Sequence, residues 1–149
     1  MLTSRDYTLD DLRKLVVETG RISNPKHSYM FWGHIWVREG RDPLSDQELI
    51  HKGIHMVQED EVNVVTMLLF FIASVVFGIP VYTFILGILW IIIFWYTTLF
   101  YLLELVSVLC LGYKYNPLEQ EASENQGNIE YMKKRKMFSW LKYLVKNPK

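Results

Sequence analysis

The chain has 149 residues, with 16 Lys or Arg and 16 Asp or Glu, so its formal net charge is zero. Its single cysteine, Cys110, excludes an internal disulfide and the paired-cysteine zinc and iron–sulfur sites. Acidic residues are in excess over residues 1–61 and basic residues over residues 114–149, without the broad basic surface of a nucleic-acid-binding protein. Cys110 is expected to pack as a small apolar residue.

The N-terminal flank, residues 1–61, is predicted to be an extramembrane segment with two short helices. Thr8 is followed by Asp11, and Ser45 by Glu48. In each pair a short polar side chain and an acid three residues later have the spacing of a capping box, which satisfies the free N–H groups at a helix start. Each helix has an apolar stripe that needs a surface to pack on.

Between these helices, Arg21–Pro43 is predicted to be an ordered loop or an extended segment, because it is rich in glycine and proline turn signals. Its centre, Tyr29–Val37, is strongly aromatic. Two explanations are open. The aromatic side chains can lie in a membrane interface, where Trp and Tyr are favoured. They can also anchor a protein contact, and the mixed charges of Arg38–Asp42 favour this second explanation.

Two histidines, His51 and His55, are four residues apart on the predicted second helix and project from one face, which Glu59 continues. This spacing can hold a metal ion. However, no third ligand is in register, and Lys52 stands where a zinc protease needs a glutamate. Hydrogen-bonded or exposed histidines are therefore the preferred interpretation. The sequence predicts no catalytic, cofactor-binding or metal-ligating residue and no cofactor.

The segment Val62–Tyr113 dominates the chain, because Glu104 is its only charged residue. An apolar run of this length is sufficient for two membrane spans. Pro80 is the strongest helix breaker within it. We therefore expect a transmembrane hairpin with one helix over residues 62–79 and a second over residues 81–103 or longer.

Glu104 has two interpretations. If the second span begins near residue 81, Glu104 lies at the level of the headgroups, where a carboxylate is unremarkable. If the span begins near Gly87, Glu104 is deeper in the membrane and becomes a functional candidate, because buried charges are costly there. We favour the first interpretation. A basic residue of a partner subunit can also pair with Glu104.

The C-terminal flank, residues 114–149, is predicted to begin with a helix end at Asn116–Pro117 and a polar linker over Glu119–Asn128. Ile129–Lys146 combines a basic cluster at residues 133–136 with apolar and aromatic positions. This pattern predicts an amphipathic helix on an anionic lipid surface. A calmodulin-type target or a subunit contact has a similar pattern.

The predicted fold is therefore an all-α membrane protein: a two-helix transmembrane hairpin with short N-terminal helices and a basic amphipathic C-terminal helix. Two spans place both flanks on one side, and the basic tail favours the cytoplasmic or matrix side.

No sequence motif indicates an enzyme. The favoured hypothesis is a non-catalytic accessory subunit of a large membrane complex, in the mitochondrial respiratory chain or the ATP synthase of the inner membrane. Its partners would be other membrane-protein subunits and lipid, with no nucleic acid. The alternative is an endoplasmic-reticulum hairpin protein that shapes or scaffolds the membrane. A third, weaker hypothesis is an enzyme or cofactor subunit that uses His51, His55 and Glu104.

Overall fold

The computed structural model describes a mostly helical chain organised around one long helix. That helix, α2, runs over Asp46–Val76, and its 31 residues correspond to a length of about 46 Å. The described residues are 7–24, 27–31, 33–78, 80–90, 98–112 and 115–144. The other helices are α1 (Leu9–Lys14), α3 (Val81–Trp90), α4 (Thr98–Leu111), α5 (Pro117–Asn125), α6 (Ile129–Lys134) and α7 (Leu141–Leu144), and the strands are β1 (Val16–Thr19), β2 (Tyr29–Phe31) and β3 (His34–Arg38).

Local capping signals define where the two N-terminal helices begin. Thr8 Oγ1 accepts from the backbone N–H of Asp11, and the Asp11 carboxylate accepts from the N–H of Thr8. Ser45 and Glu48 form the same reciprocal pair at the start of α2. Both predicted capping boxes are confirmed. They are determined by residues three apart, so the sequence contains the whole signal.

The prediction of an all-α fold is wrong, because three strands form a sheet in the order β1-β3-β2. β1 is parallel to β3, with Val16 opposite Ile35, and β2 is antiparallel to β3, with Met30 opposite Ile35. Gly33 adopts a positive φ of 67° in the turn between β2 and β3. The aromatic segment is therefore a hairpin, whose Met30 and Ile35 are buried.

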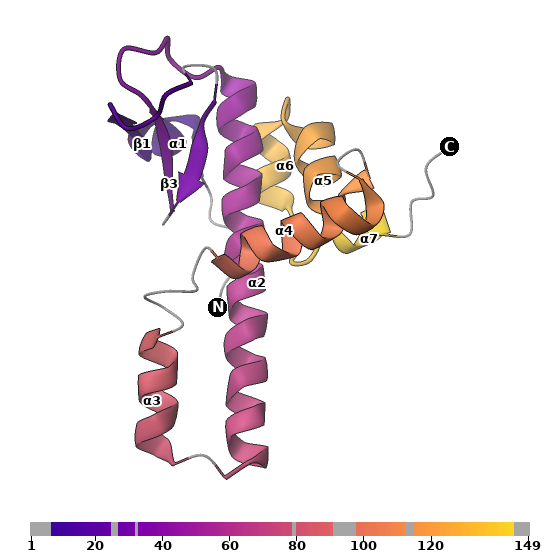
Figure 1. Cartoon of the computed structure of the whole chain (residues 1–149). Helices are drawn as coiled ribbons and strands as arrows, with labels where there is room; N and C mark the ends of the chain where they lie inside the picture. The colour runs from indigo at the N-terminus through magenta and orange to yellow at the C-terminus, as the bar shows by residue number, and fades with distance from the viewer. Residues whose placement is uncertain are drawn as a thin grey trace.

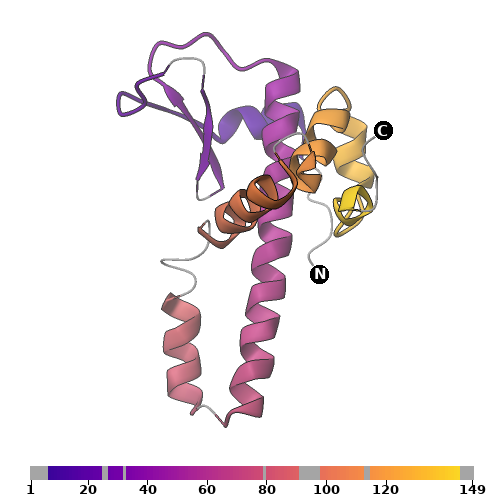
Figure 2. The same ribbon diagram turned by 45° about the vertical axis from the view of Figure 1, so that its right-hand side comes forward.

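The core surrounds the N-terminal half of α2. Helix α1 and the sheet cover one side of it, and α5 and α6 cover the other (Figure 1). Figure 2 shows the same arrangement after rotation, with α4 crossing α2 near its middle. The innermost apolar side chains come from all of these elements: Leu12, Ile35, Leu49, Ile54, Phe100, Leu118 and Met132.

The prediction of a two-helix transmembrane hairpin is also wrong, and with it the membrane and transmembrane-helix assignment. Among the described residues, no helix is both long enough and apolar enough to cross a bilayer. The part of α2 that corresponds to the expected first span continues a helix that begins at Asp46, and its Val62 and Asn63 are buried in the protein.

The second expected span, residues 81–103 or longer, also differs from the structure. Helix α3 has 10 residues and α4 has 14, or about 15 and 21 Å, against the roughly 30 Å of a hydrocarbon core. Residues 91–97 lie outside the described residues. The expected reversal near Pro80 is observed, since α2 ends at Val76 and α3 starts at Val81 beside it (Figure 1).

The basic amphipathic C-terminal helix over Ile129–Lys146 is not formed as one element. Helix α6 ends at Lys134, and α7 begins at Leu141. Arg135, a member of the predicted surface cluster, is 6% exposed and carries buried ion pairs. Helix α5 (Pro117–Asn125) replaces most of the linker predicted over Glu119–Asn128, because Asn116 caps α5 and Pro117 occupies its first turn. The Asn116–Pro117 pair marks a helix start and not an end.

Candidate functional site

The candidate site is a pocket of about 140 Å³ where α2, α4 and α5 meet. His51 and His55 reach it from successive turns of α2. Glu119 reaches it from the first turn of α5, and Glu104 from α4. Lys52 also lines the pocket. The structure therefore brings together residues from three helices that are far apart in the sequence.

Three side chains point their polar atoms at one another. His51 Nε2 lies 3.1 Å from His55 Nε2. His55 Nε2 lies 3.2 Å from Glu119 Oε2, and His51 Nε2 lies 3.4 Å from Glu119 Oε1. All three side chains are largely buried, with 16, 7 and 13% of their surface exposed. They form a compact set of potential metal ligands among the described residues.

The neighbouring Gln58 determines which ring nitrogen of His55 carries a proton. Gln58 Nε2 donates to the carbonyl of Leu118 at 3.0 Å and to Glu121 Oε2 at 2.9 Å, so its Oε1 faces His55. His55 Nδ1 is 2.7 Å from that oxygen. The Nδ1 must then carry the proton, because an amide oxygen only accepts. In the neutral ring, the lone pair of His55 Nε2 consequently points into the cluster.

His51 is the less satisfied of the two histidines. Its Nδ1 is buried without a hydrogen-bond partner. Burial and the neighbouring His55 lower the pKa of His51 to about 4. At neutral pH the ring is therefore uncharged and offers a lone pair, the form in which imidazole binds metals.

The carboxylates and the amine around the pocket influence one another. Burial raises the pKa of Glu104, with His55 and Lys52 opposing that shift. Burial lowers the pKa of Lys52, while Glu119 and Glu104 act in the opposite direction. Two carboxyl groups and one amine therefore line the pocket together.

No known protein family, curated protein or solved structure matches this chain.

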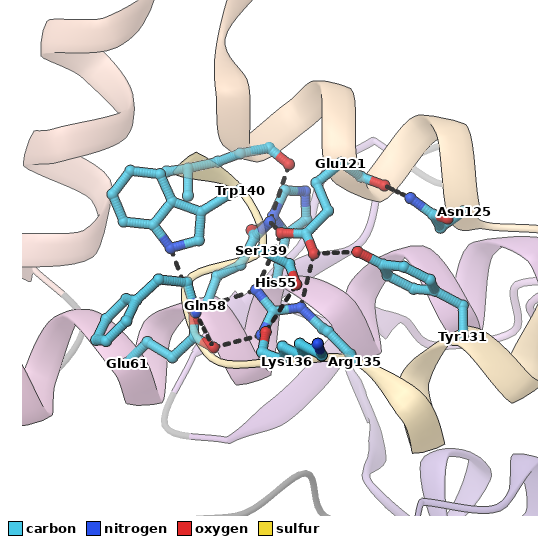
Figure 3. A network of polar contacts seen from close by, with 12 residues as sticks. His55, Gln58, Glu61, Glu121, Asn125, Tyr131, Arg135, Lys136, Ser139 and Trp140 are labelled. Carbon is cyan, nitrogen blue, oxygen red and sulfur yellow. Dashed lines mark hydrogen bonds and ion pairs between the residues drawn. The ribbon is translucent and has the colours of Figure 1, made fainter. Parts of the chain in front are cut away.

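A second polar cluster lies close by and is centred on Arg135 (Figure 3). Its guanidinium donates to Glu121 from Nε at 2.8 Å and from Nη2 at 2.9 Å. It also donates to Glu61 from Nη1 and from Nη2. The three charged side chains are at most 4% exposed. Both carboxylates thus share one cation in the interior.

Further hydrogen bonds satisfy the remaining lone pairs of these carboxylates. Tyr131 OH donates to Glu121 Oε1 at 2.5 Å, and Trp140 Nε1 donates to Glu61 Oε2 at 3.1 Å. The backbone N–H of Phe138 donates to Glu61 Oε1 at 2.9 Å. The network ties the middle of α2 to α5 and to the C-terminal segment. It fixes Gln58, and through Gln58 it orients His55 (Figure 3).

The remaining unusual surface is the apolar arm, which we define as residues 65–77 of α2 and its C-cap together with α3. The arm contains no charged residue. Its side chains on α2 are exposed on several faces, as shown by Leu69 at 61%, Val75 at 66% and Phe77 at 78%. A helix that is apolar all round is normally buried.

Only part of the site can be predicted from the sequence. His51, His55 and Glu104 are the residues of the third, weaker hypothesis, and the structure places them around one pocket. Glu119 is not among them, because it falls in the predicted linker. The helix-start signal of Asn116 and Pro117 would have placed Glu119 on a first helical turn. Cys110, expected to be packed, is exposed on α4.

Proposed function

We propose that this protein is a non-catalytic structural subunit that inserts its apolar arm among the helices of partner subunits in a larger assembly. The observation that supports this most is the exposure of the arm. Leu68, Leu69, Val75, Val76 and Phe77 each expose more than half of their surface. In water each of these side chains lacks the stabilisation that full burial would give, about 1.5–3 kcal/mol per side chain.

Helix α3 covers only a small part of this apolar surface. It packs on α2 closely at Gly87, where the ring of Phe70 leaves no space for a Cβ. Elsewhere Ile85, Leu86 and Leu89 remain exposed on α3. A two-helix hairpin buries one face of each helix, so the other faces need further apolar elements.

Helix α4 carries further exposed apolar side chains. Leu102, Leu105, Val106 and Leu109 are exposed and recur at helical spacing along one side. This stripe has the i, i+3, i+4, i+7 pattern with which one helix packs against another. The stripe adds to the exposed apolar side chains of the apolar arm, and large exposed apolar patches usually mark interaction sites.

The occupant we propose is a set of apolar helices from partner subunits. The arm has neither lysine nor arginine, the residues with which a protein surface engages anionic lipid headgroups. In contrast, the body beside the arm is held rigidly by the Arg135 network. A rigid body with a projecting apolar arm suits a part that joins other subunits. The mitochondrial inner membrane, the respiratory chain and the ATP synthase stay predictions of where this assembly lies.

Site-specific cross-linking tests this function. Leu69, on the arm, is replaced by a photoreactive benzoylphenylalanine, and the same replacement at Leu144 serves as the control, since Leu144 is also exposed (54%) but lies on α7. We expect Leu69 to give one or two protein adducts of fixed mass in the native membranes or extract, and Leu144 to give none of these. Adducts only to lipid at Leu69, or the same adducts from both positions, would contradict the proposal.

A further inference from the structure

We propose that His51, His55 and Glu119 bind one divalent transition-metal ion, with Zn²⁺ the best fit, and that this ion joins α2 to α5. The inference is independent of the apolar arm and of any partner. It rests on the three ligand atoms of the cluster, their separations and the hydrogen bonds around them.

The separations are close to those of a metal site. Zinc–nitrogen and zinc–oxygen bonds of about 2.0–2.2 Å in a tetrahedron place neighbouring ligand atoms about 3.3–3.6 Å apart. The separations between His51 Nε2, His55 Nε2 and the Glu119 oxygens are 3.1, 3.2 and 3.4 Å, so one lies within this range and two are slightly shorter. Two of them involve different oxygens of the same carboxylate, so the carboxylate can turn toward a single ion.

Hydrogen bonding alone leaves the two histidines poorly satisfied. His55 Nε2 is an acceptor, because Gln58 holds the His55 proton on Nδ1. Glu119 Oε1 accepts from Ser123 Oγ at 3.4 Å, whereas within the cluster only His51 Nε2 can donate to His55 Nε2. His51 Nδ1 would then be an acceptor without a partner. A cation at the centre would instead accept a lone pair from each of the three groups.

The surroundings also resemble those of metal-binding histidines. Such a histidine usually donates its second N–H to an oxygen, which fixes the ring and its tautomer. His55 does this toward Gln58 at 2.7 Å. The adjoining pocket, which Glu104 also lines, leaves a fourth position for water. Lys52 stands beside His51 instead of a carboxylate base, so the ion is proposed as a structural link and not as a hydrolytic centre.

The test is metal binding by the full-length chain, purified with its partners or in a mild detergent and stripped with a chelator. Zn²⁺ is titrated by calorimetry, and Co²⁺ replaces it for the visible ligand-field bands of a four-coordinate site. We expect one ion per chain. In His51→Gln and in Glu119→Gln the dissociation constant should rise at least about tenfold. The control His27→Gln changes an exposed histidine outside the cluster and should bind like the wild type.

Equal affinity in the wild type and both cluster variants would overturn the proposal, because binding would then occur elsewhere. The absence of any bound Zn²⁺ in the wild type would do the same. A second measurement covers variants that fold poorly. The midpoint of thermal unfolding of the wild type should rise with Zn²⁺ and stay unchanged with Mg²⁺, which prefers all-oxygen ligands. An unchanged midpoint with Zn²⁺ would contradict the site.

Discussion

Arg135 is the residue on which the interior of the protein depends most. It is the only cation among the described contacts of Glu61 and Glu121, and all three side chains are buried. Breaking a buried ion pair by removing one partner leaves an uncompensated charge, which costs about 3–5 kcal/mol. Here two carboxylates would lose their shared partner at once.

The replacement Arg135→Met should therefore lower the free energy of unfolding by about 3–5 kcal/mol. Urea unfolding followed by tryptophan fluorescence measures the change. Arg13→Met is the matched control, because Arg13 pairs with Asp46 at the surface and its side chain is 55% exposed. An exposed pair contributes about 0–1 kcal/mol. Equal losses in the two variants would show that the Arg135 network has no special role in stability.

Glu59 has a different effect on stability. It is 1% exposed, and its Oε1 has no hydrogen-bond partner. Burial, with a contribution from Asp60, raises the pKa of Glu59 to about 7 from its ordinary value of 4.5. The folded state therefore binds the proton more tightly than the unfolded state. Its contribution to stability is greatest below about pH 4.5 and is lost as the pH rises to about 7.

Replacement by a neutral side chain, Glu59→Gln, should remove this pH dependence. Between pH 5 and 8 the wild type should lose up to about 3 kcal/mol of unfolding free energy relative to the variant. Urea unfolding at several pH values measures the difference. Glu18→Gln, at an exposed position on β1, should leave the profile of the wild type unchanged. Parallel profiles for the wild type and Glu59→Gln would exclude a buried, proton-binding Glu59.

At the scale of elements, the close approach of α1, α2 and α6 depends on Gly53. A Cβ added there would lie 2.7 Å from Met132 Cε and 3.1 Å from Leu12 Cδ2. Both neighbours belong to the buried core. A side chain on α2 at this position must therefore displace the Met132 or Leu12 side chain, or the helix that carries it.

The variant Gly53→Leu should destabilise the fold by about 1–3 kcal/mol through overpacking, even though leucine is the better helix former. The change in unfolding free energy in urea measures this cost. Gly127→Leu is the control, because nothing lies within 4 Å of its Cβ position. If Gly53→Leu is as stable as the wild type, the helices do not approach as closely as described.

The sequence predicts those elements whose signals are local. The capping pairs Thr8–Asp11 and Ser45–Glu48 are complete within four residues, and both are present as expected. The strands are not predictable in this way, because β1 pairs with β3 through residues about twenty positions away. The full site is not predictable from local signals for the same reason, since Glu119 lies 64 positions after His55 in the chain.

At the scale of the whole molecule, two parts with different properties share α2. The N-terminal half of α2 is enclosed by α1, the sheet, α5 and α6, and it carries the His–Glu cluster and the Arg135 network (Figure 1). From residue 65 onward α2 belongs to the apolar arm, where α3 packs beside it among the described elements (Figure 1). The apolar run that dominates the sequence therefore corresponds to an exposed surface next to a well-packed body.

The central claim is that partner subunits cover the apolar arm, and the size of the native particle tests it most directly. The double variant Leu69→Asp with Leu86→Asp places charge on both helices of the arm, and Leu144→Asp places it on α7. A buried, unpaired carboxylate costs several kcal/mol, so the double variant should dissociate. Native electrophoresis after mild extraction, with mass spectrometry of the bands, reports the result.

We predict that the wild type and Leu144→Asp migrate together in one large complex, whereas the double variant runs as a free chain of 17.7 kDa with its bound detergent. Circular dichroism should show that the double variant retains its helical content, since both changed positions are exposed. A wild-type chain that itself runs free, or a double variant that stays in the complex, would contradict the account.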